Sequence, residues 1–298
     1  MIKMRSPGSG KPPAGEDRPH VLLTCAGRRN YLIGQFRAAL GGRGRVFATD
    51  CRADAAALAE ADAGFVLPPA DDEEYPGRLL ALCREQRVGL VVPLNDLELP
   101  VLARNRERFR ATGVRLLVST PEVIELCFDK LATDRQLHRW GFVTPLTFAD
   151  LGEALHALDR GRLALPLVVK PRHGSGSVGV EVCRDRRELV LAHQLLARRL
   201  ARAGTDQPEG TVLVQEFIAG AEYGLDIVND LSGRNVSVFV KRKLAMRAGE
   251  TDRAETLINE DLLRVGRELG TRLGHVGNLD CDAFLCRRDV VVMELNPR

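Results

Sequence analysis

Residues 20–118 alternate short apolar runs with segments of helical periodicity, and this alternation restricts the fold more than any other feature of the chain. Val- and Leu-rich runs of this kind are typical of strands buried on both faces, which occur in parallel sheets covered by helices. Helices are predicted for residues 31–40, 55–63, 75–87 and 100–112. The predicted strands are Val21–Thr24, Val46–Thr49, Phe65–Pro68, Val88–Pro93 and Arg115–Val118.

These elements predict an α/β fold in which residues 20–119 form a Rossmann-like open sheet. Ligands of such sheets bind at the carboxyl ends of the strands, where this chain carries Asp50 and the polar run Asn95–Glu98. The first turn, Cys25–Arg29, lacks the G-x-G-x-x-G pattern that cradles a pyrophosphate. We therefore interpret Asp50 as a structural cap of its loop, and Asn95–Glu98 as a segment that could contact substrate or a second domain.

Composition excludes several classes of protein. Of 298 residues, 45% are hydrophobic and 28% charged, with a net charge of +3, so neither a nucleic-acid surface nor a basic arm is indicated. The 7 cysteines are odd in number and form no C-x-x-C, which argues against disulfides or zinc and favours the cytoplasm. No apolar run is long enough to span a membrane. Residues 1–19, rich in Gly, Pro and charge, predict a disordered lead-in and not a secretory signal.

A glycine-rich loop lies in the remaining part, residues 120–298, which we predict to be a second domain. It follows the strand Leu165–Pro171 and precedes the strand-like run Val180–Cys183, so it predicts a hairpin tip and not the strand–loop–helix of a dinucleotide site. Its backbone N–H groups could fold over phosphates, and Lys170 stands close enough to reach phosphate oxygens. A plain hairpin turn is the alternative. The loop residues are Gly174, Ser175, Gly176, Ser177 and Gly179.

The next two strands offer a backbone edge and a basic end. An adenine could pair with the edge formed by Gln215, Glu216, Phe217 and Ile218, and Glu222 could accept from ribose hydroxyls. The alternative is an ordinary hairpin with exposed acids.

The strand that starts at Val236 ends in the bases Lys241, Arg242 and Lys243, which predict a charge clamp beside the phosphate loop. A solvated edge strand protected by bases is the alternative. An amphipathic helix is predicted for residues 256–273.

The last residues of the chain predict a β-hairpin that carries oxygen ligands. If its register pairs Asp282 with Glu294, these carboxylates converge with Asn296, and Asp280 shares the face of Asp282. Such an incomplete oxygen cage suits Mg²⁺, which also takes substrate phosphates as ligands. The alternative is an acidic hairpin end with solvated charges.

Taken in chain order, these motifs resemble the ATP-grasp enzymes, in the branch similar to carbamoyl-phosphate synthase large-subunit ATP-binding domains. The resemblance covers residues 20–298 and implies a pre-ATP-grasp domain at 20–119 and an ATP-grasp domain of two α+β subdomains at 120–298. It implies that Lys130 and Lys170 bind the nucleotide and that the glycine loop closes over it. It further implies an adenine and ribose segment at 215–222 and magnesium ligands at Asp282 or Asp280, Glu294 and Asn296. It implies that the basic residues Arg298, Arg242 and Lys243 act in catalysis by holding the transferred phosphoryl group or the substrate carboxylate.

The same resemblance implies the reaction and the partners. We expect a ligase that uses ATP and Mg²⁺, with Mn²⁺ as an alternative, to join a small-molecule carboxylate to an amine or a thiol through an acyl phosphate. We expect no nucleic-acid or membrane partner, and a homodimer as one option. Because relatives continue beyond the N-P-R ending, we expect the ATP-grasp domain to be truncated here. The alternatives are a nucleotide-binding regulatory module without turnover, a carboxylase or carbamoyl-phosphate-forming enzyme, and an NAD-dependent oxidoreductase.

Overall fold

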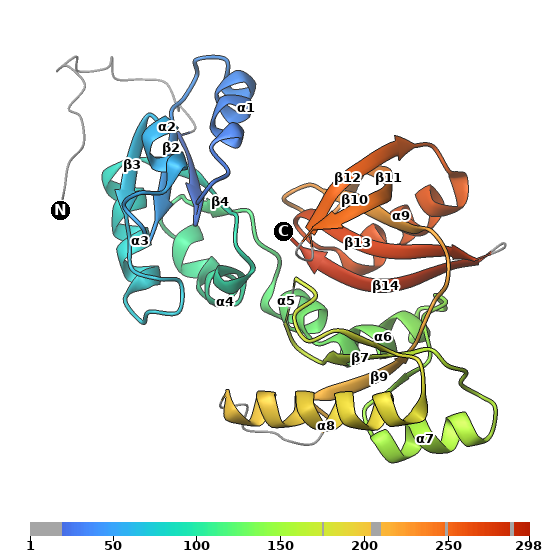
Figure 1. Cartoon of the computed structure of the whole chain (residues 1–298). Coiled ribbons are helices and arrows are strands. Elements are labelled where there is room, and N and C mark those ends of the chain that lie inside the picture. The colour runs from blue at the N-terminus through green and yellow to red at the C-terminus, as the bar shows by residue number, and fades with distance from the viewer. Residues whose placement is uncertain (1–19, 175, 204–209, 248–249, 287–288) are drawn as a thin grey trace. The chain divides into compact units, whose positions relative to one another are not determined.

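The computed structural model describes residues 20–174, 176–203, 210–247, 250–286 and 289–298. The predicted lead-in 1–19 and the loop residue Ser175 lie outside these ranges. The chain divides into two compact units, drawn with their elements in Figure 1. The first unit comprises Met1–Ile124, His275–Gly277 and Arg298, and the second comprises Glu125–Gly274 and Asn278–Pro297.

The first unit contains the predicted parallel sheet, with strand order β3-β2-β1-β4-β5. On one face, α1 and α2 contribute Ile33 and Ala57 to a core with Val21 and Val46. The fold prediction for this part is confirmed. Its elements are β1 (His20–Thr24), α1 (Tyr31–Leu40), β2 (Val46–Asp50), α2 (Ala56–Glu60), β3 (Ala63–Val66), α3 (Tyr75–Glu85), β4 (Val88–Pro93), η1 (Asp96–Glu98), α4 (Leu99–Arg110) and β5 (Arg115–Leu116).

Asp50, at the end of β2, caps the loops around it. Its carboxylate accepts hydrogen bonds from the backbone N–H of Gly27 at 2.8 Å and of Arg52 at 3.0 Å. Gly27 sits in the first turn with φ +52°, a conformation that favours glycine. Both carboxylate oxygens are therefore engaged by the backbone, which agrees with the structural interpretation of this residue.

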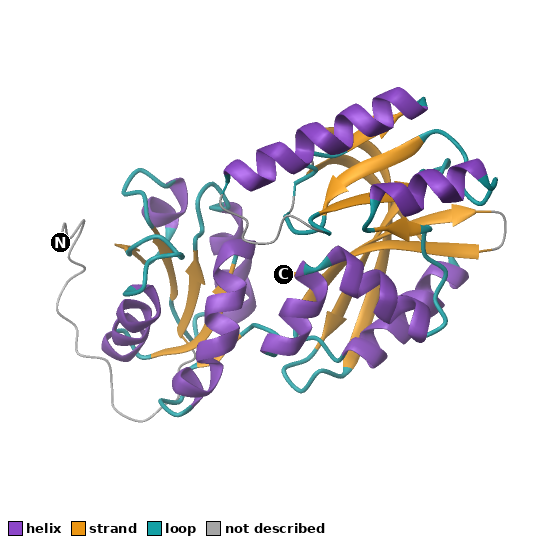
Figure 2. Cartoon of the chain, turned by 90° about the horizontal axis from the view of Figure 1, so that it is seen from below, coloured by secondary structure: helices purple, strands orange, loops and turns teal. Residues whose placement is uncertain are grey.

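A four-stranded antiparallel sheet, β6-β9-β7-β8, forms one part of the second unit. Helices α7 and α8 pack on it, with Ala154, Leu189 and Leu196 against Val169 and Val214. Figures 1 and 2 show α8 lying along this sheet. The elements are α5 (Pro121–Phe128), α6 (Lys130–Arg139), β6 (Thr147–Phe148), α7 (Leu151–Asp159), β7 (Leu167–Pro171), β8 (Glu181–Cys183), α8 (Arg186–Arg202) and β9 (Val212–Glu216).

A second sheet, in the order β12-β11-β10-β13-β14, completes this unit. Helix α9 lies so close to it that a Cβ on Gly266 would stand 2.6 Å from Val238 Cγ1, and one on Gly270 would stand 2.9 Å from Ile227 Cγ2. Two glycines four residues apart thus let the helix approach the strands. The elements are β10 (Glu222–Asn229), β11 (Asn235–Arg247), β12 (Glu250–Leu257), α9 (Glu260–Leu273), β13 (Gly277–Cys286) and β14 (Asp289–Pro297).

The start of α9 corrects the predicted helix 256–273. Thr256 and Leu257 belong to the edge strand β12, which pairs with β11. The helix begins only after Asn259, whose side chain accepts a hydrogen bond from Leu262 N at 3.0 Å. An asparagine N-cap of this kind marks the helix boundary.

The β13–β14 hairpin contains a bulge that sets its register. Asp282 pairs with Glu294, but the next residue, Ala283, pairs with Val292, so β14 carries one extra residue, Met293. If Met293 instead paired with Asp282 in a regular ladder, Glu294 would stand opposite Cys281 and face the core, because side chains alternate between the two faces of a sheet. The bulge therefore places Glu294 and Asn296 on the same face as Asp282 and Asp280.

Candidate active site

The N-terminus of α6 is tied to the strand that leads into the glycine loop. Asp129 caps the helix by accepting from the N–H groups of Leu131 and Ala132, and it receives Arg172 in a two-point ion pair at 2.7 and 2.5 Å. Lys130, the next residue, donates from Nζ to the carbonyl of Gly174 at 2.5 Å and stands 3.4 Å from Glu294 Oε1. The loop and β14 thus meet at the Lys130 ammonium.

Lys170, on β7, is buried, with 6% of its surface exposed. Burial lowers its pKa, and the ammonium of Lys130 acts in the same direction, while the carboxylates of Glu294, Asp134 and Asp282 oppose the change. A buried ammonium that shares its surroundings with another ammonium is suited to bind an anion. The structure therefore brings together Lys130, Lys170 and Glu294, three of the residues predicted from the sequence.

The glycine loop connects β7 to β8, and the two strands are antiparallel, with Leu167 opposite Cys183. The strand that follows the loop confirms the hairpin prediction and distinguishes it from a dinucleotide-binding turn. Among the described loop residues, four adopt positive φ: Gly174 at 117°, Gly176 at 67°, Ser177 at 57° and Gly179 at 77°. Positive φ values so close together turn the backbone sharply and are typical of loops whose N–H groups face a ligand.

The predicted adenine segment follows β9. Gln215 is buried, and its side chain donates to Thr147 Oγ1 at 2.8 Å. Glu216 binds Leu146 twice, with its N–H donating to the Leu146 carbonyl at 2.9 Å and its carboxylate accepting from the Leu146 N–H at 3.2 Å. Phe217 and Ile218 come after the end of the strand, and Phe217 is exposed. Phe217 and Ile218 therefore offer the backbone groups with which an adenine could pair.

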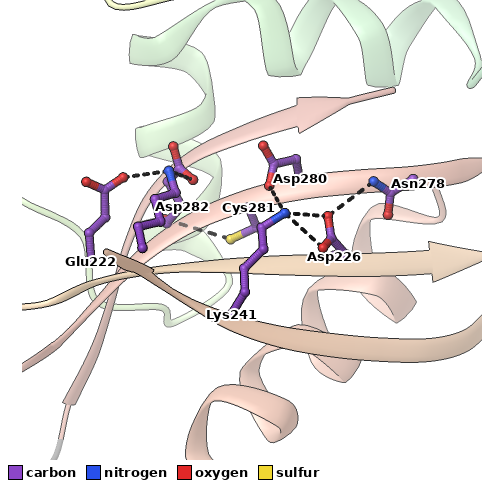
Figure 3. A network of polar contacts seen from close by, with 8 residues as sticks. Glu222, Asp226, Lys241, Asn278, Asp280, Cys281 and Asp282 are labelled. Atoms are coloured by element: carbon purple, nitrogen blue, oxygen red, sulfur yellow. Dashed lines mark hydrogen bonds and ion pairs between the residues drawn. The ribbon is translucent and has the colours of Figure 1, made fainter. Parts of the chain in front are cut away.

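Lys243, on β11, contacts carboxylates on two other strands. Its ammonium stands 2.6 Å from Glu222 Oε1 of β10 and 2.6 Å from Asp282 Oδ1 of β13, and Figure 3 labels these two carboxylates. Burial lowers the Lys243 pKa, but the two carboxylates together raise it above its usual value. Burial raises the pKa of Asp282 to about 6 in spite of the lysine. Glu222, expected to be free for a ribose, has a lysine partner.

A second network, in which a lysine again contacts two carboxylates, lies beside the first and was not predicted from the sequence. Lys241 donates to both oxygens of Asp226, at 2.9 and 3.0 Å, and stands 3.5 Å from Asp280 (Figure 3). Asn278 donates to Asp226 at 3.4 Å. The lysine stem passes over Gly224, where a Cβ would stand 2.6 Å from Cε. A period of two residues was the available signal, because Lys241 and Lys243, like Asp280 and Asp282, share one face.

Arg242 and Arg298 are the two remaining basic residues predicted for the site. Arg242 is exposed, and its position between Lys241 and Lys243 puts it on the opposite face of β11, so the structure does not bring it together with them. Arg298 follows the end of β14 and pairs with Asp96, which belongs to the first unit as Arg298 itself does.

The carboxylates of Asp282 and Glu294 fit a divalent cation that is also bound by phosphate oxygens and water. Among the described residues there is no group of three or more His, Cys, Asp and Glu side chains that could hold a metal. Asp282 and Glu294 are paired across the hairpin, and the buried Oδ1 of Asp280 makes no hydrogen bond to the described residues, its nearest cation being Lys241 at 3.5 Å. Two carboxylates and an amide make a cage for Mg²⁺ only together with phosphate oxygens and water.

Family matches agree with this geometry. Residues 21–117 match the PylC-like N-terminal domain, and residues 127–298 match the ATP-grasp domain. The chain belongs to the ATP-grasp family. The matched region includes both lysines, the glycine loop and the β13–β14 hairpin. None of the described helices is long and apolar enough to cross a bilayer.

Relatives of this ATP-grasp chain include longer proteins. The uncharacterized protein y4rH of Sinorhizobium fredii is 33% identical over 187 residues, covering 60% of this chain and 37% of that protein. The carbamoyl phosphate synthase large chain of Clostridium beijerinckii is 23% identical over 197 residues, covering 61% of this chain and 17% of that protein. The chain thus spans well under half the length of these relatives.

Solved structures share the fold. The biotin carboxylase domain of Hydrogenobacter thermophilus 2-oxoglutarate carboxylase, in complex with MgADP, ADP and bicarbonate, has a TM-score of 0.72 at 18% identity, covering 94% of this chain and 64% of that one. L-amino acid ligase from Bacillus licheniformis has a TM-score of 0.67 at 20% identity, covering 95% of this chain and 68% of that one. The whole described architecture is therefore that of ATP-grasp enzymes.

Proposed function

We propose that this chain binds MgATP, with Mn²⁺ as an alternative metal, and ligates a small-molecule carboxylate to an amine or a thiol. The observation that supports it is the grouping of Lys130, Lys170 and Glu294 at the base of the glycine loop, in a chain of the ATP-grasp family. Two ammonium groups beside a loop of N–H donors favour a polyphosphate.

The chemistry needs no nucleophile from the protein. The carboxylate of the acid attacks the γ-phosphorus. The bond between the γ-phosphorus and the β–γ bridging oxygen breaks, and ADP leaves. The amine or thiol then attacks the acyl carbon, and inorganic phosphate leaves with the electron pair of the broken C–O bond. Catalysis is therefore a matter of position and of charge neutralisation.

Individual residues have separate roles in this proposal. Lys130 and Lys170 hold the phosphates, the glycine loop excludes water from the acyl phosphate, and the backbone of Phe217 and Ile218 holds the adenine. Lys243 and Arg298 bind the transferred phosphoryl group or the substrate carboxylate. Asp282, Glu294 and Asn296 hold the Mg²⁺, which neutralises charge on the phosphates when it is bound.

The test is MgATP-dependent release of ADP across a panel of acids combined with amines or thiols. ADP release should require both an acid and a nucleophile. Glu294→Ala should keep the affinity for ADP but lose most of the Mg²⁺-dependent release, because one carboxylate ligand is gone. Full release by this variant would contradict the metal assignment. ADP binding without any acid-dependent release would instead favour a regulatory module.

A second candidate uses bicarbonate as the acid. It is favoured by the similarity to carbamoyl phosphate synthase large chains and by the carboxylase fold match. In this case bicarbonate alone should stimulate ADP release, and an amine should not be required for the first turnover.

A further inference from the structure

Lysines contact both carboxylates that are proposed as metal ligands. The Lys243 ammonium contacts Asp282 Oδ1 at 2.6 Å, and Lys130 stands 3.4 Å from Glu294 Oε1. Only 6% of the Lys243 side chain is exposed, and Glu222 holds it from the other side at 2.6 Å. A cation that coordinates this oxygen of Asp282 therefore has to displace a buried ammonium.

A divalent cation alone would stand beside ammonium groups. Lys243 and Lys130 already contact Asp282 and Glu294, and the ammonium groups of Lys130 and Lys170 share their surroundings. A cation at Asp282 would repel Lys243 and leave Glu222 as its remaining partner, and this is unfavourable for a mostly buried ammonium. A nucleotide brings more negative charge than the cation cancels, and its phosphates provide new partners for the displaced lysines.

We propose that Lys243 closes the metal position at Asp282 in the free protein, so that the divalent cation enters only with the nucleotide. The inference rests on the proposed function, since it concerns the same site. Its consequence is that the site carries no metal between catalytic cycles, and that the lysine moves from Asp282 to the phosphates when both ligands bind. Lys243 is thus a residue that couples the two binding events.

The experiment measures Mn²⁺ binding to the whole chain without nucleotide, from the loss of the electron paramagnetic resonance signal of free Mn²⁺. The wild type should bind Mn²⁺ weakly. Lys243→Met should bind it at least about ten-fold more tightly, because the carboxylate is then unpaired. Lys243→Gln, which keeps a polar side chain, should show the same gain and serves if the Met variant does not fold, as judged by circular dichroism.

Two aspartate variants locate the gain. In the Lys243→Met background, Asp282→Asn should remove it, whereas the matched change Asp280→Asn, two residues away on the same face, should leave at least half of it. Tight Mn²⁺ binding by the wild type without nucleotide would overturn the inference. So would equal Mn²⁺ affinities in the wild type and in both Lys243 variants.

A parallel titration with ADP separates this inference from the proposed function. If the wild type binds MnADP but the Lys243 variants gain no affinity for Mn²⁺ alone, only the coupling by Lys243 is wrong. If the wild type binds neither ADP nor MnADP, the proposed function is wrong, and the inference fails with it.

Discussion

Lys170 is buried, and no hydrogen bond from its ammonium to a carboxylate is seen among the described residues, whereas Lys243 has such a bond to Asp282. Burial lowers the pKa of Lys170, and an anion that binds beside it would stabilise the ammonium form. By contrast, Lys241 has its own aspartate at 2.9 Å. These two lysines of the same unit therefore differ in what they can still bind.

Replacing Lys170 tests this difference. Lys170→Met should weaken ADP binding by at least about ten-fold, equivalent to roughly 1.4 kcal/mol, because a phosphate loses its buried cation. The fold should be retained, since an apolar side chain of similar size replaces a buried charge. Isothermal titration calorimetry measures the affinity, and Lys241→Met, which lies outside the proposed nucleotide contacts, is the control. Unchanged affinity in Lys170→Met would remove this residue from the site.

Site residues were predictable from the sequence where a motif keeps them close together in the chain, as in the glycine loop after Lys170. Contacts between site residues on different strands were not predictable. Glu222, Lys243 and Asp282 meet only because β10 lies between β11 and β13, and the strand order of a sheet is a long-range property. Local periodicity shows which residues share a face of one strand but not which strands are neighbours.

At the scale of elements, helix α9 packs closely against its sheet at Gly266, whereas α1 has open space at Gly34. The Cβ of an alanine at position 266 would overlap Val238 Cγ1, at 2.6 Å, whereas nothing lies within 4 Å of a Cβ at Gly34 in α1. Both glycines are within helices, so the same substitution has the same intrinsic effect on helix propensity at each position.

We expect Gly34→Ala and Gly266→Ala to have opposite effects. Gly34→Ala should stabilise its unit by about 0.5–1 kcal/mol through helix propensity. Gly266→Ala should destabilise its unit by about 1–2 kcal/mol, because the overlap with β11 outweighs that gain. Urea unfolding followed by circular dichroism measures both free energies of unfolding. A stabilising Gly266→Ala would show that the helix moves away from the sheet at little cost.

Most helices and buried strands were predictable because their periodicity is strong; α1, for example, has the predicted bounds, Tyr31–Leu40. Strand β12 was missed because its sequence, ETDRAETL, is polar and gives no apolar alternation. An edge strand exposed to water does not need apolar residues, and its pairing with β11 comes from the backbone. The same polar residues at helical spacing extended the predicted helix too far toward the N-terminus.

At the scale of the whole molecule, the proposed nucleotide residues belong to the second unit, so the ligand should stabilise that unit. MgADP at about a hundred times its Kd should add roughly 2.7 kcal/mol to its free energy of unfolding. Differential scanning calorimetry should then show a rise of several degrees in the transition of this unit. NADH at the same concentration is the control and should produce no rise. A rise with NADH alone would favour an oxidoreductase and contradict the proposed function.

The single-residue bulge at Met293 has a consequence for how this sequence can change during evolution. Val292 faces the core and Glu294 the open face although they are two residues apart, so the loss of Met293 would leave a regular strand with Glu294 still opposite Asp282. The loss of Leu295 would instead turn Asn296 into the core, because no bulge residue would then compensate for the change of register. A deletion at Met293 should therefore be tolerated in functional descendants of the chain, whereas a deletion of one residue between Glu294 and Asn296 should be absent from them.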